Sequence, residues 1–592
     1  MSWFEKARCG LGRGPFGPLF VLFVCLSARG LGQTYNDFSY EVSGSNVTIT
    51  LYRGLGGAVT IPSSIPGVGS VTSIGVNAFR DCYSLTGLTI PDSVTNIGGG
   101  AFADSGLTSV TIPDSLTSIE DNVFWGCSNL TSVTIPSSVI SIGSDAFSYC
   151  TRLTGVTIPD SVTSLGLYAF ASCSSLTSVT IPKSITFIMP GCFSYCTSLT
   201  SVTIPDSVTN IGGYAFPNCA RLTSITIPDS VTFIGDQAFT SCTSLTTVII
   251  PDSVVSLGAL AFAYCTGLTN ATIGNGVTSI GASAFDTCTS LTTVTIGNSV
   301  TNIMGDAFYY CPGLKAITVD PQDTAYSSLN GVLFDKSRSL LIQYPADLIG
   351  PYSIPNTVTS IQTNAFAWCE GLTTVTIGNS VTNIGDWAFA YCHSLTSATI
   401  GNSVANIGGR AFAYCSVLSN AMIGNSVTSI GDLAFIGCFL TVSVTIPSSV
   451  THIGNLAFDG CTKLTSAYFQ GNAPPSFGQG VFDAAAPGFS IYYPTTATGW
   501  TGPNWNGYAA QPYVYTPPEQ LPALVLLRGL EAITPSFSNL RLGTNYQLQV
   551  SDDLNTWSNT GLAFTATNAT EVYPQTFDSK LKQLFFRLES PP

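Results

Sequence analysis

The stretch Leu199–Arg221, LTSVTIPDSVTNIGGYAFPNCAR, is the unit from which most of this 592-residue chain is built. Near-copies precede and follow it at a fixed step of 23 residues. The isoleucine of each Ile-Pro or Ile-Gly pair marks that step at positions 112, 135, 158, 181, 204, 227, 250, 273 and 296, and again at 354, 377, 400, 423 and 446. A fixed short period is characteristic of chains that stack one small structural unit many times. The period therefore decides the fold before any local propensity does.

The apolar positions of one unit indicate which side faces a core. Val202 and Ile204 alternate with polar residues, as in a half-buried strand, and Pro205 ends the strand because it has no N–H to donate. Burying the apolar side chains of one unit contributes roughly 10 kcal/mol. Ordering its backbone costs on the order of a few tens of kcal/mol. One unit therefore cannot fold alone, whereas stacked copies can, because each covers the open faces of its neighbours.

The spacing Leu-x-x-Val-x-Ile of Leu199–Ile204 resembles the opening of leucine-rich repeats. The continuation, with Ile-Pro, Ile-Gly, Ala-Phe and then Cys, resembles the BspA-like leucine-rich-repeat family of surface proteins across residues 38–482. The pattern lacks the asparagine of the commonest leucine-rich repeats. We expect a β-rich solenoid of this leucine-rich-repeat type, a parallel sheet of about 17 rungs. The resemblance implies adhesion or protein binding at a surface.

The chain begins with the features of a secretory signal. Residues 1–32 carry Lys6, Arg8 and Arg13 ahead of an apolar run at 18–26, and small residues follow. This order is typical of a signal peptide, and the apolar run is too short to span a bilayer. We therefore expect a secreted or cell-surface protein, without a transmembrane helix in the mature chain because no other apolar run is long enough.

Changes in composition and period predict the remaining segments. The step lengthens to 35 residues between Val319 and Ile354, where we expect a protruding hairpin, and the period fades after Tyr468. The final segment alternates as strands and resembles small terminal modules of secreted bacterial proteins. The predicted segments are a capping segment at 33–72, the solenoid at 73–483 with a hairpin insertion at about 320–353, an aromatic, Pro- and Gly-rich closure and linker at 484–522, and a small β-sandwich-like domain at 523–592.

Charge and histidine content exclude several classes of function. The net charge is −14 and no cluster of Lys and Arg follows residue 13, so a nucleic-acid partner is not expected. The chain has only two histidines, His393 and His452, and both fall in ordinary surface positions of the repeat. Without a histidine base a hydrolase is disfavoured. We therefore expect no enzyme activity, no catalytic residues and no cofactor.

Most of the 18 cysteines recur once per repeat, every 23 residues. The exceptions are two in the predicted signal peptide, Cys82 in an early unit, and Cys192, which replaces the alanine of an Ala-Phe pair. Equivalent side chains of stacked rungs lie parallel, with Cβ atoms about 4.8 Å apart. A disulfide requires about 3.8 Å. The spacing therefore predicts a buried ladder of reduced thiols. The thiols form a line and not a tetrahedral cluster, so we expect no metal.

Aspartates also form a row, at Asp92, Asp114, Asp160, Asp206, Asp229 and Asp252. A turn aspartate that accepts local N–H groups is one interpretation, and calcium shared between neighbouring carboxylates is the other.

The outward side of the strand is the candidate ligand-binding face. The residue before the repeat isoleucine is threonine in most units, which stacks hydroxyls into a row interrupted at Ile249 and Met422. β-Branched threonine also simply suits an exposed strand. The candidate residues are Thr111, Thr134, Thr157, Thr180, Thr203, Thr226, Thr272 and Thr295. We interpret the protein as a scaffold for a protein or glycan ligand, with a carbohydrate- or ice-binding lattice on these threonines as the alternative.

Overall fold

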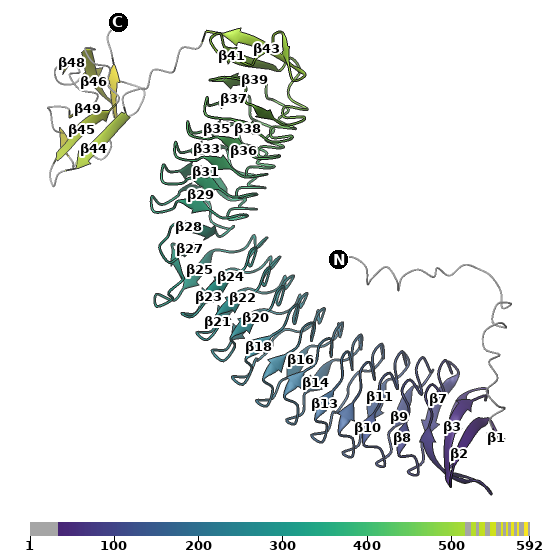
Figure 1. Cartoon of the computed structure of the whole chain (residues 1–592). Coiled ribbons are helices and arrows are strands. Elements are labelled where there is room, and N and C mark those ends of the chain that lie inside the picture. The colour runs from purple at the N-terminus through teal and green to yellow at the C-terminus, as the bar shows by residue number, and fades with distance from the viewer. Residues whose placement is uncertain are drawn as a thin grey trace. The chain divides into compact units, whose positions relative to one another are not determined.

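The computed structural model describes residues 33–514 and eight strands beyond residue 522 (Figure 1). The predicted signal peptide at 1–32 and the linker at 515–522 lie outside the described residues. The chain divides into two compact units. The first contains the described residues up to Phe469 together with Ala473–Ile491, and the second contains Gln470–Asn472 and the residues from Tyr492 onward.

The first unit is a parallel-strand solenoid of about 20 turns, and its regular elements in the described residues are all strands. The predicted class, a parallel solenoid of leucine-rich-repeat type, is confirmed, with about 20 turns where the sequence predicted about 17. Most turns carry one strand that ends at the repeat isoleucine or one residue before it, here called a long strand (Figure 1). The long strands are β4 (Gly57–Thr60), β7 (Leu85–Thr89), β9 (Ser109–Thr111), β11 (Ser132–Thr134), β14 (Ser178–Thr180), β16 (Ser201–Thr203), β19 (Thr247–Ile250), β21 (Asn270–Ile273), β23 (Thr293–Ile296), β25 (Ala316–Val319), β29 (Gly350–Ser353), β31 (Leu372–Ile377), β33 (Ser397–Ile400), β35 (Asn420–Met422), β37 (Ser443–Ile446) and β39 (Ser466–Phe469).

A second, two-residue strand follows in most turns at the Asn-Ile or Ser-Ile pair, here called a short strand. Equivalent residues pair in parallel from one turn to the next, as in Asn210 of β17 with Phe233 of β18. The short strands are β8 (Asn96–Ile97), β10 (Ser118–Ile119), β12 (Ser141–Ile142), β13 (Ser164–Leu165), β15 (Phe187–Ile188), β17 (Asn210–Ile211), β18 (Phe233–Ile234), β20 (Ser256–Leu257), β22 (Ser279–Ile280), β24 (Asn302–Ile303), β30 (Ser360–Ile361), β32 (Asn383–Ile384), β34 (Asn406–Ile407), β36 (Ser429–Ile430), β38 (His452–Ile453) and β40 (Ser476–Phe477).

A small antiparallel sheet precedes the repeats. It pairs β1 with β2 and β2 with β3, and β3 then pairs in parallel with β6, which continues to β8. These strands are β1 (Gln33–Tyr35), β2 (Phe38–Ser43), β3 (Asn46–Tyr52), β5 (Ser64–Ile65) and β6 (Gly69–Ile74). The side chains of Val47, Ile49 and Val71 are fully buried, so the sheet covers the core face of the first repeat.

Stacked phenylalanines run through the core. From Phe79 to Phe308 neighbouring ring centroids lie 5.2 to 5.8 Å apart, and from Phe366 to Phe482 they lie 4.5 to 5.5 Å apart. Aromatic pairs at such distances add to the free energy gained by burying their area. The core is therefore continuous from turn to turn, as the repeat period predicts.

The repeat cysteines form a second buried row. All 16 described cysteines are free, and all but Cys82 are buried. Most of these thiols donate to the carbonyl of a phenylalanine in the preceding turn, as in Cys242 Sγ to Phe216 O at 3.3 Å and Cys265 Sγ to Phe239 O at 3.2 Å. Cys369 instead donates to Tyr344 O. The structure thus contains the predicted row of buried thiols, and their reduced state stays a prediction.

A third set of inter-turn bonds lies at the turn edge, which comprises residues 145–150 of one unit and their equivalents. Phe147 N donates to Ala169 O and Tyr149 N donates to Ala171 O, both at 2.8 Å. Two residues in this segment have positive φ, Asp145 at 54° and Tyr149 at 60°. This conformation lets alternate N–H groups point toward the next turn.

The insertion at 320–353 contains β26 (Tyr326–Leu329), β27 (Val332–Asp335) and β28 (Leu340–Gln343). β26 pairs antiparallel with β27 and β27 with β28, and β28 then pairs in parallel with short strand β30. The segment therefore contains antiparallel hairpin pairs where the sequence predicts a hairpin insertion. It also joins the sheet of short strands through β28, which the sequence did not predict. That sheet is interrupted between β24 and the insertion, where Tyr326 Oη accepts a hydrogen bond from Ile303 N at 2.9 Å.

The closing strands are β41 (Ser490–Pro494), β42 (Asn504–Trp505) and β43 (Tyr508–Tyr513), and β42 pairs antiparallel with β43. In the second unit β45 pairs antiparallel with β44, β49 and β50, and β46 pairs antiparallel with β47, β48 and β51. A β-sandwich-like domain at 523–592 stays a prediction. Its strands are β44 (Ala523–Arg528), β45 (Ala532–Ser538), β46 (Asn545–Ser551), β47 (Ser558–Asn559), β48 (Phe564–Thr565), β49 (Thr570–Val572), β50 (Phe577–Asp578) and β51 (Phe585–Glu589).

Candidate functional site

The candidate threonines lie in register on the outward side of the solenoid. Residues at this position alternate with buried ones, so the side chains of Val202 and Ile204 enter the core while that of Thr203 is exposed. We call the eight threonines the threonine face: Thr111, Thr134, Thr157, Thr180, Thr203, Thr226, Thr272 and Thr295, all exposed. Direct pairing joins Thr111 to Thr134, Thr134 to Thr157, Thr180 to Thr203, and Thr272 to Thr295.

A neighbouring row of threonines differs in its hydrogen bonds. Each hydroxyl of this row donates to the carbonyl of the equivalent residue one turn earlier, as in Thr177 Oγ1 to Thr154 O at 3.1 Å. We call four of these residues the bonded row: Thr131, Thr154, Thr177 and Thr200. Within the described residues, no hydroxyl of the threonine face makes such a bond. The threonine face therefore presents hydroxyls that remain available to a ligand.

The threonine face carries no charge. From Ser109 to Thr318 the two outward positions of every turn hold Ser, Thr, Asn, Gly, Ala or Ile. Ile249 is 67% exposed and Met422 is 56% exposed, so the face is apolar at the two interruptions expected from the sequence. A neutral surface rich in hydroxyls suits a ligand that offers hydrogen-bonding groups without net charge.

The aspartate row beside this face bridges turns. Asp160 Oδ1 accepts a hydrogen bond from Lys183 N at 3.3 Å, and Asp252 Oδ1 accepts one from Asn275 N at 2.6 Å. In the part of the chain that the structure describes, no three His, Cys, Asp or Glu side chains gather closely enough to hold a metal ion. Asp160 and Asp252 thus behave as the turn aspartates of the first interpretation.

The two histidines lie apart from the threonine face. His452 Nδ1 is 2.8 Å from Ser476 Oγ, and the His393 ring lies 6.2 Å from that of Tyr391. Both histidines are exposed.

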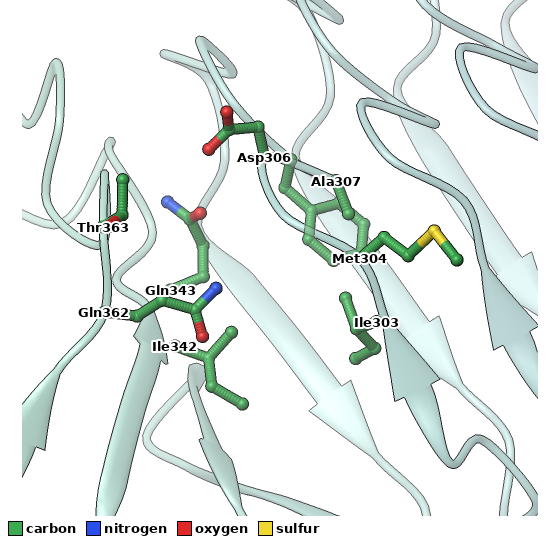
Figure 2. A pocket seen from close by; sticks show the side chains of 9 residues that line it. Ile303, Met304, Asp306, Ala307, Ile342, Gln343, Gln362 and Thr363 are labelled. Atoms are coloured by element: carbon green, nitrogen blue, oxygen red, sulfur yellow. The ribbon is translucent and has the colours of Figure 1, made fainter.

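A cleft that the sequence did not predict lies where the sheet of short strands is interrupted (Figure 2). Gln343 and Gln362 lie on one side of it, and Ile303 and Met304 lie on the other (Figure 2). The space in it that a water molecule can occupy is about 10 Å³, room for about one water. Sites for small molecules are far larger. The 35-residue step was the only signal for this cleft, and that step does not reveal which side chains line it.

The architecture defines a class of protein, a leucine-rich solenoid with parallel strands. The family described as "BspA type Leucine rich repeat region" matches residues 72–200, 188–315 and 348–465, in 6 copies. These segments cover more than half of the chain, so the chain belongs to this family. Among the described residues, no helix has both the length and the apolar character needed to cross a membrane.

Solved structures with similar folds come from several bacteria. A leucine-rich repeat protein from Bacteroides ovatus is 23% identical, with 81% of this chain and 99% of that chain covered and a TM-score of 0.40. A leucine rich cell surface protein from Faecalibacterium prausnitzii is 26% identical, with 82% and 98% covered and a TM-score of 0.28. The T. pallidum leucine-rich repeat protein is 30% identical, with 36% and 90% covered and a TM-score of 0.28. No curated protein matches the chain.

Proposed function

We propose that this protein is a secreted or cell-surface adhesion scaffold without catalytic activity, and that it binds a protein or glycan ligand through the threonine face. The observation that carries the proposal is the contrast between two adjacent rows of exposed threonines. The hydroxyls of the bonded row are occupied by backbone carbonyls, as in Thr200 Oγ1 to Thr177 O at 3.0 Å, whereas those of the threonine face are not.

The physical argument concerns extended surfaces. A solenoid presents equivalent side chains once per turn, so a long ligand meets the same chemistry repeatedly. Each exposed hydroxyl contributes little by itself, since a hydrogen bond exchanged with water is worth about 1 kcal/mol. When one part of a long ligand is bound, its next part is held close to the next turn at a high effective concentration. Many weak contacts along one ligand therefore give a high overall affinity. The predicted signal peptide and the family support a location outside the cytoplasm.

The test uses two matched quadruple variants of the full-length protein on a glycan and protein array. One changes Thr134, Thr157, Thr180 and Thr203 of the threonine face to Val, and the other changes the bonded row, Thr131, Thr154, Thr177 and Thr200, to Val. Valine keeps the β-branched shape that strands favour. The first variant should lose at least about tenfold in affinity for the ligand found. Its melting temperature should hardly change, because exposed substitutions usually stay within about 0.5 kcal/mol.

The bonded-row variant is the control and should show the opposite pattern. Its affinity for the ligand should be unchanged, and its free energy of unfolding should fall by about 0.5–1.5 kcal/mol per hydrogen bond removed. If the threonine-face variant binds as tightly as the unmodified chain, the threonine face is not the binding surface.

A carbohydrate- or ice-binding lattice is the second candidate, and the neutral, in-register hydroxyls favour it. An ice-recrystallisation assay with the same two variants tests it. If the unmodified chain inhibits ice recrystallisation and only the threonine-face variant loses that inhibition, the protein is a lattice binder and the adhesion proposal is wrong.

A further inference from the structure

A cluster of aromatic residues lies on the turn edge beside the insertion. The residue before the repeat cysteine is aromatic in four successive units, Tyr310, Trp368, Tyr391 and Tyr414, which we call the aromatic cluster. Ring centroids lie 4.8 Å apart for Tyr310 and Trp368, 4.0 Å apart for Trp368 and Tyr391, and 5.2 Å apart for Tyr391 and Tyr414. The last two pairs are stacked, so the rings present their edges to solvent.

Two hydrogen bonds hold this edge together across the insertion. Trp368 Nε1 donates to Tyr309 Oη at 2.9 Å, and Asn364 Nδ2 donates to Asp306 Oδ1 at 2.7 Å. The turn edge is therefore continuous where the sheet of short strands is interrupted. The aromatic cluster is thus placed by specific contacts.

The backbone does not favour aromatic residues at these positions. φ is 47° at Tyr310, 64° at Trp368, 60° at Tyr391 and 57° at Tyr414, a region that bulky side chains rarely adopt. Other turns hold glycine at the same position with positive φ, at Gly126, Gly437 and Gly460. Holding a bulky residue there costs on the order of 1 kcal/mol. Four successive aromatics therefore need a reason other than backbone geometry.

Arg410, which has no ion pair with a carboxylate of the described residues, lies beside the aromatic cluster. The guanidinium carbon of Arg410 lies 4.8 Å from the centroid of the Trp387 ring, and that ring lies 6.2 Å from the ring of Tyr391. A guanidinium over an indole is attracted to the ring face and keeps its N–H donors free. The ion pairs found among the described residues join other side chains, Arg80 to Asp81 and Lys315 to Asp347.

Phenol hydroxyls complete the group of donors. Burial raises the pKa of the Tyr391 phenol, the nearby Tyr414 and Tyr309 phenols raise it further, and Arg410 lowers it. The geometry places these groups in one cluster, because the stacked rings of Tyr391 and Tyr414 lie 5.2 Å apart and Arg410 lies over the Trp387 ring, whose centroid is 6.2 Å from that of Tyr391. Because the net shift is upward, Tyr391 stays an O–H donor at neutral pH.

We propose that Arg410, Tyr391 and Tyr414 bind the carboxylate of a uronic acid in an acidic polysaccharide. One guanidinium and two phenol O–H groups supply charge-assisted hydrogen bonds to a single carboxylate. The surrounding aromatic edges and hydroxyls suit the neutral sugars on either side. An acidic peptide with a carboxylate on every residue fits less well, because it would bring further carboxylates beside the exposed Glu370 and Asp386. In the polysaccharide, neutral sugars lie on either side of each uronic acid.

The experiment is isothermal titration calorimetry of the full-length protein with hyaluronan oligosaccharides, in which uronic acids alternate with neutral sugars. Arg410→Gln should weaken binding by about tenfold or more, since hydrogen bonds to charged groups are among the strong ones. Tyr391→Phe combined with Tyr414→Phe keeps the rings, removes both hydroxyls and should weaken binding by about threefold to tenfold. Carboxyl-reduced hyaluronan should not bind.

Matched controls come from the first block of repeats. Tyr195 and Tyr264 occupy the same turn position as Tyr391, and Arg221 is an exposed arginine outside this region. Tyr195→Phe with Tyr264→Phe, and separately Arg221→Gln, should leave the affinity within about twofold. The Val variant of the threonine face should also bind hyaluronan unchanged, which separates this site from the proposed adhesion surface.

Four outcomes would overturn the proposal. They are no binding of hyaluronan by the unmodified chain, equal binding of the carboxyl-reduced form, unchanged affinity in Arg410→Gln, and tighter binding of a polyglutamate peptide than of hyaluronan.

Discussion

Each repeat cysteine combines two properties at one position, since a thiol is a small apolar group and also a weak hydrogen-bond donor. Cys219 shows both, because it is fully buried and its Sγ lies 3.4 Å from Phe193 O. A methyl group would fill the space without donating, and a hydroxyl would be more costly to bury. Ser105 occupies the equivalent position in an early turn and keeps a partner there, Cys127 Sγ at 3.3 Å.

Thiol reactivity tests this arrangement. Burial raises the pKa of the Cys127 thiol to about 11 and that of Cys196 to about 12, so neither is a thiolate at neutral pH. A thiol reagent should therefore label almost none of the buried cysteines in the native protein. In denaturant without reductant it should label all 16 described cysteines. A denatured count near zero would mean that the cysteines pair as disulfides and that the spacing argument is wrong.

The sequence predicted which side chains face outward but not which of them are free. Alternation along β16 places Ser201 and Thr203 at the surface, and both are exposed, as is Thr200 just before the strand. Whether a hydroxyl is free depends on its rotamer and on its distance to a carbonyl in the preceding turn. Thr200 reaches Thr177 O at 3.0 Å, and no repeat pattern contains that distance.

At the level of the element, the repeat is the unit of register. Equivalent residues pair directly, as Ser178 with Ser201 and Thr180 with Thr203 in β14 and β16. The period predicted this pairing because only a constant step keeps every apolar position in line. The pairing of the insertion was not predictable, because a local hairpin signal does not show which strand the next one will join. In the structure Leu341 of β28 pairs with Ile361 of β30.

Deletion of one whole repeat tests the register argument. Removing Leu199–Arg221 joins Ser198 to Leu222, which restores the same order of residues. The shortened protein should fold with a melting transition by circular dichroism close to that of the full chain. Removing only Leu199–Thr209 shifts the core positions of a turn, so that variant should lose the cooperative transition. Equal melting of the two deletions would show that the repeat boundaries are wrong.

At the level of the whole molecule, the solenoid concentrates one kind of titratable group in its core. Fifteen of the described cysteines are buried, and burial dominates the upward pKa shifts of Cys265, Cys311 and Cys461, each to about 12. Tyr352 behaves similarly, because burial raises its pKa to about 12. A single buried thiol of this kind hardly affects stability at neutral pH. A row of them makes the fold sensitive to alkali.

The direction follows from proton linkage. In the unfolded chain a cysteine thiol has a pKa of about 8.5. In the folded chain burial raises the pKa of Cys127 to about 11 and those of Cys196, Cys265, Cys311 and Cys461 to about 12. Between these pKa values the unfolded state binds fewer protons than the folded state, so the free energy of unfolding falls as pH rises. The stabilising contribution is fully present below about pH 8.5 and is lost between about pH 8.5 and 12. Each thiol contributes a slope of about 1.4 kcal/mol per pH unit in that window.

We therefore expect the urea midpoint of the solenoid to be nearly constant from pH 7 to 8 and to fall steeply between pH 9 and 10. The readout is the loss of the far-ultraviolet β signal as urea is raised at each pH. Cys265→Ser combined with Cys311→Ser is the control, because serine can donate to the same Phe239 and Phe285 carbonyls but does not ionise in this range. In the control the free energy of unfolding should fall less steeply with pH. The difference in slope should equal the contribution of two thiols, about 2.8 kcal/mol per pH unit. An unchanged midpoint from pH 8 to 10 would mean that the thiols ionise as easily in the folded chain as in the unfolded one, which a buried ladder does not permit.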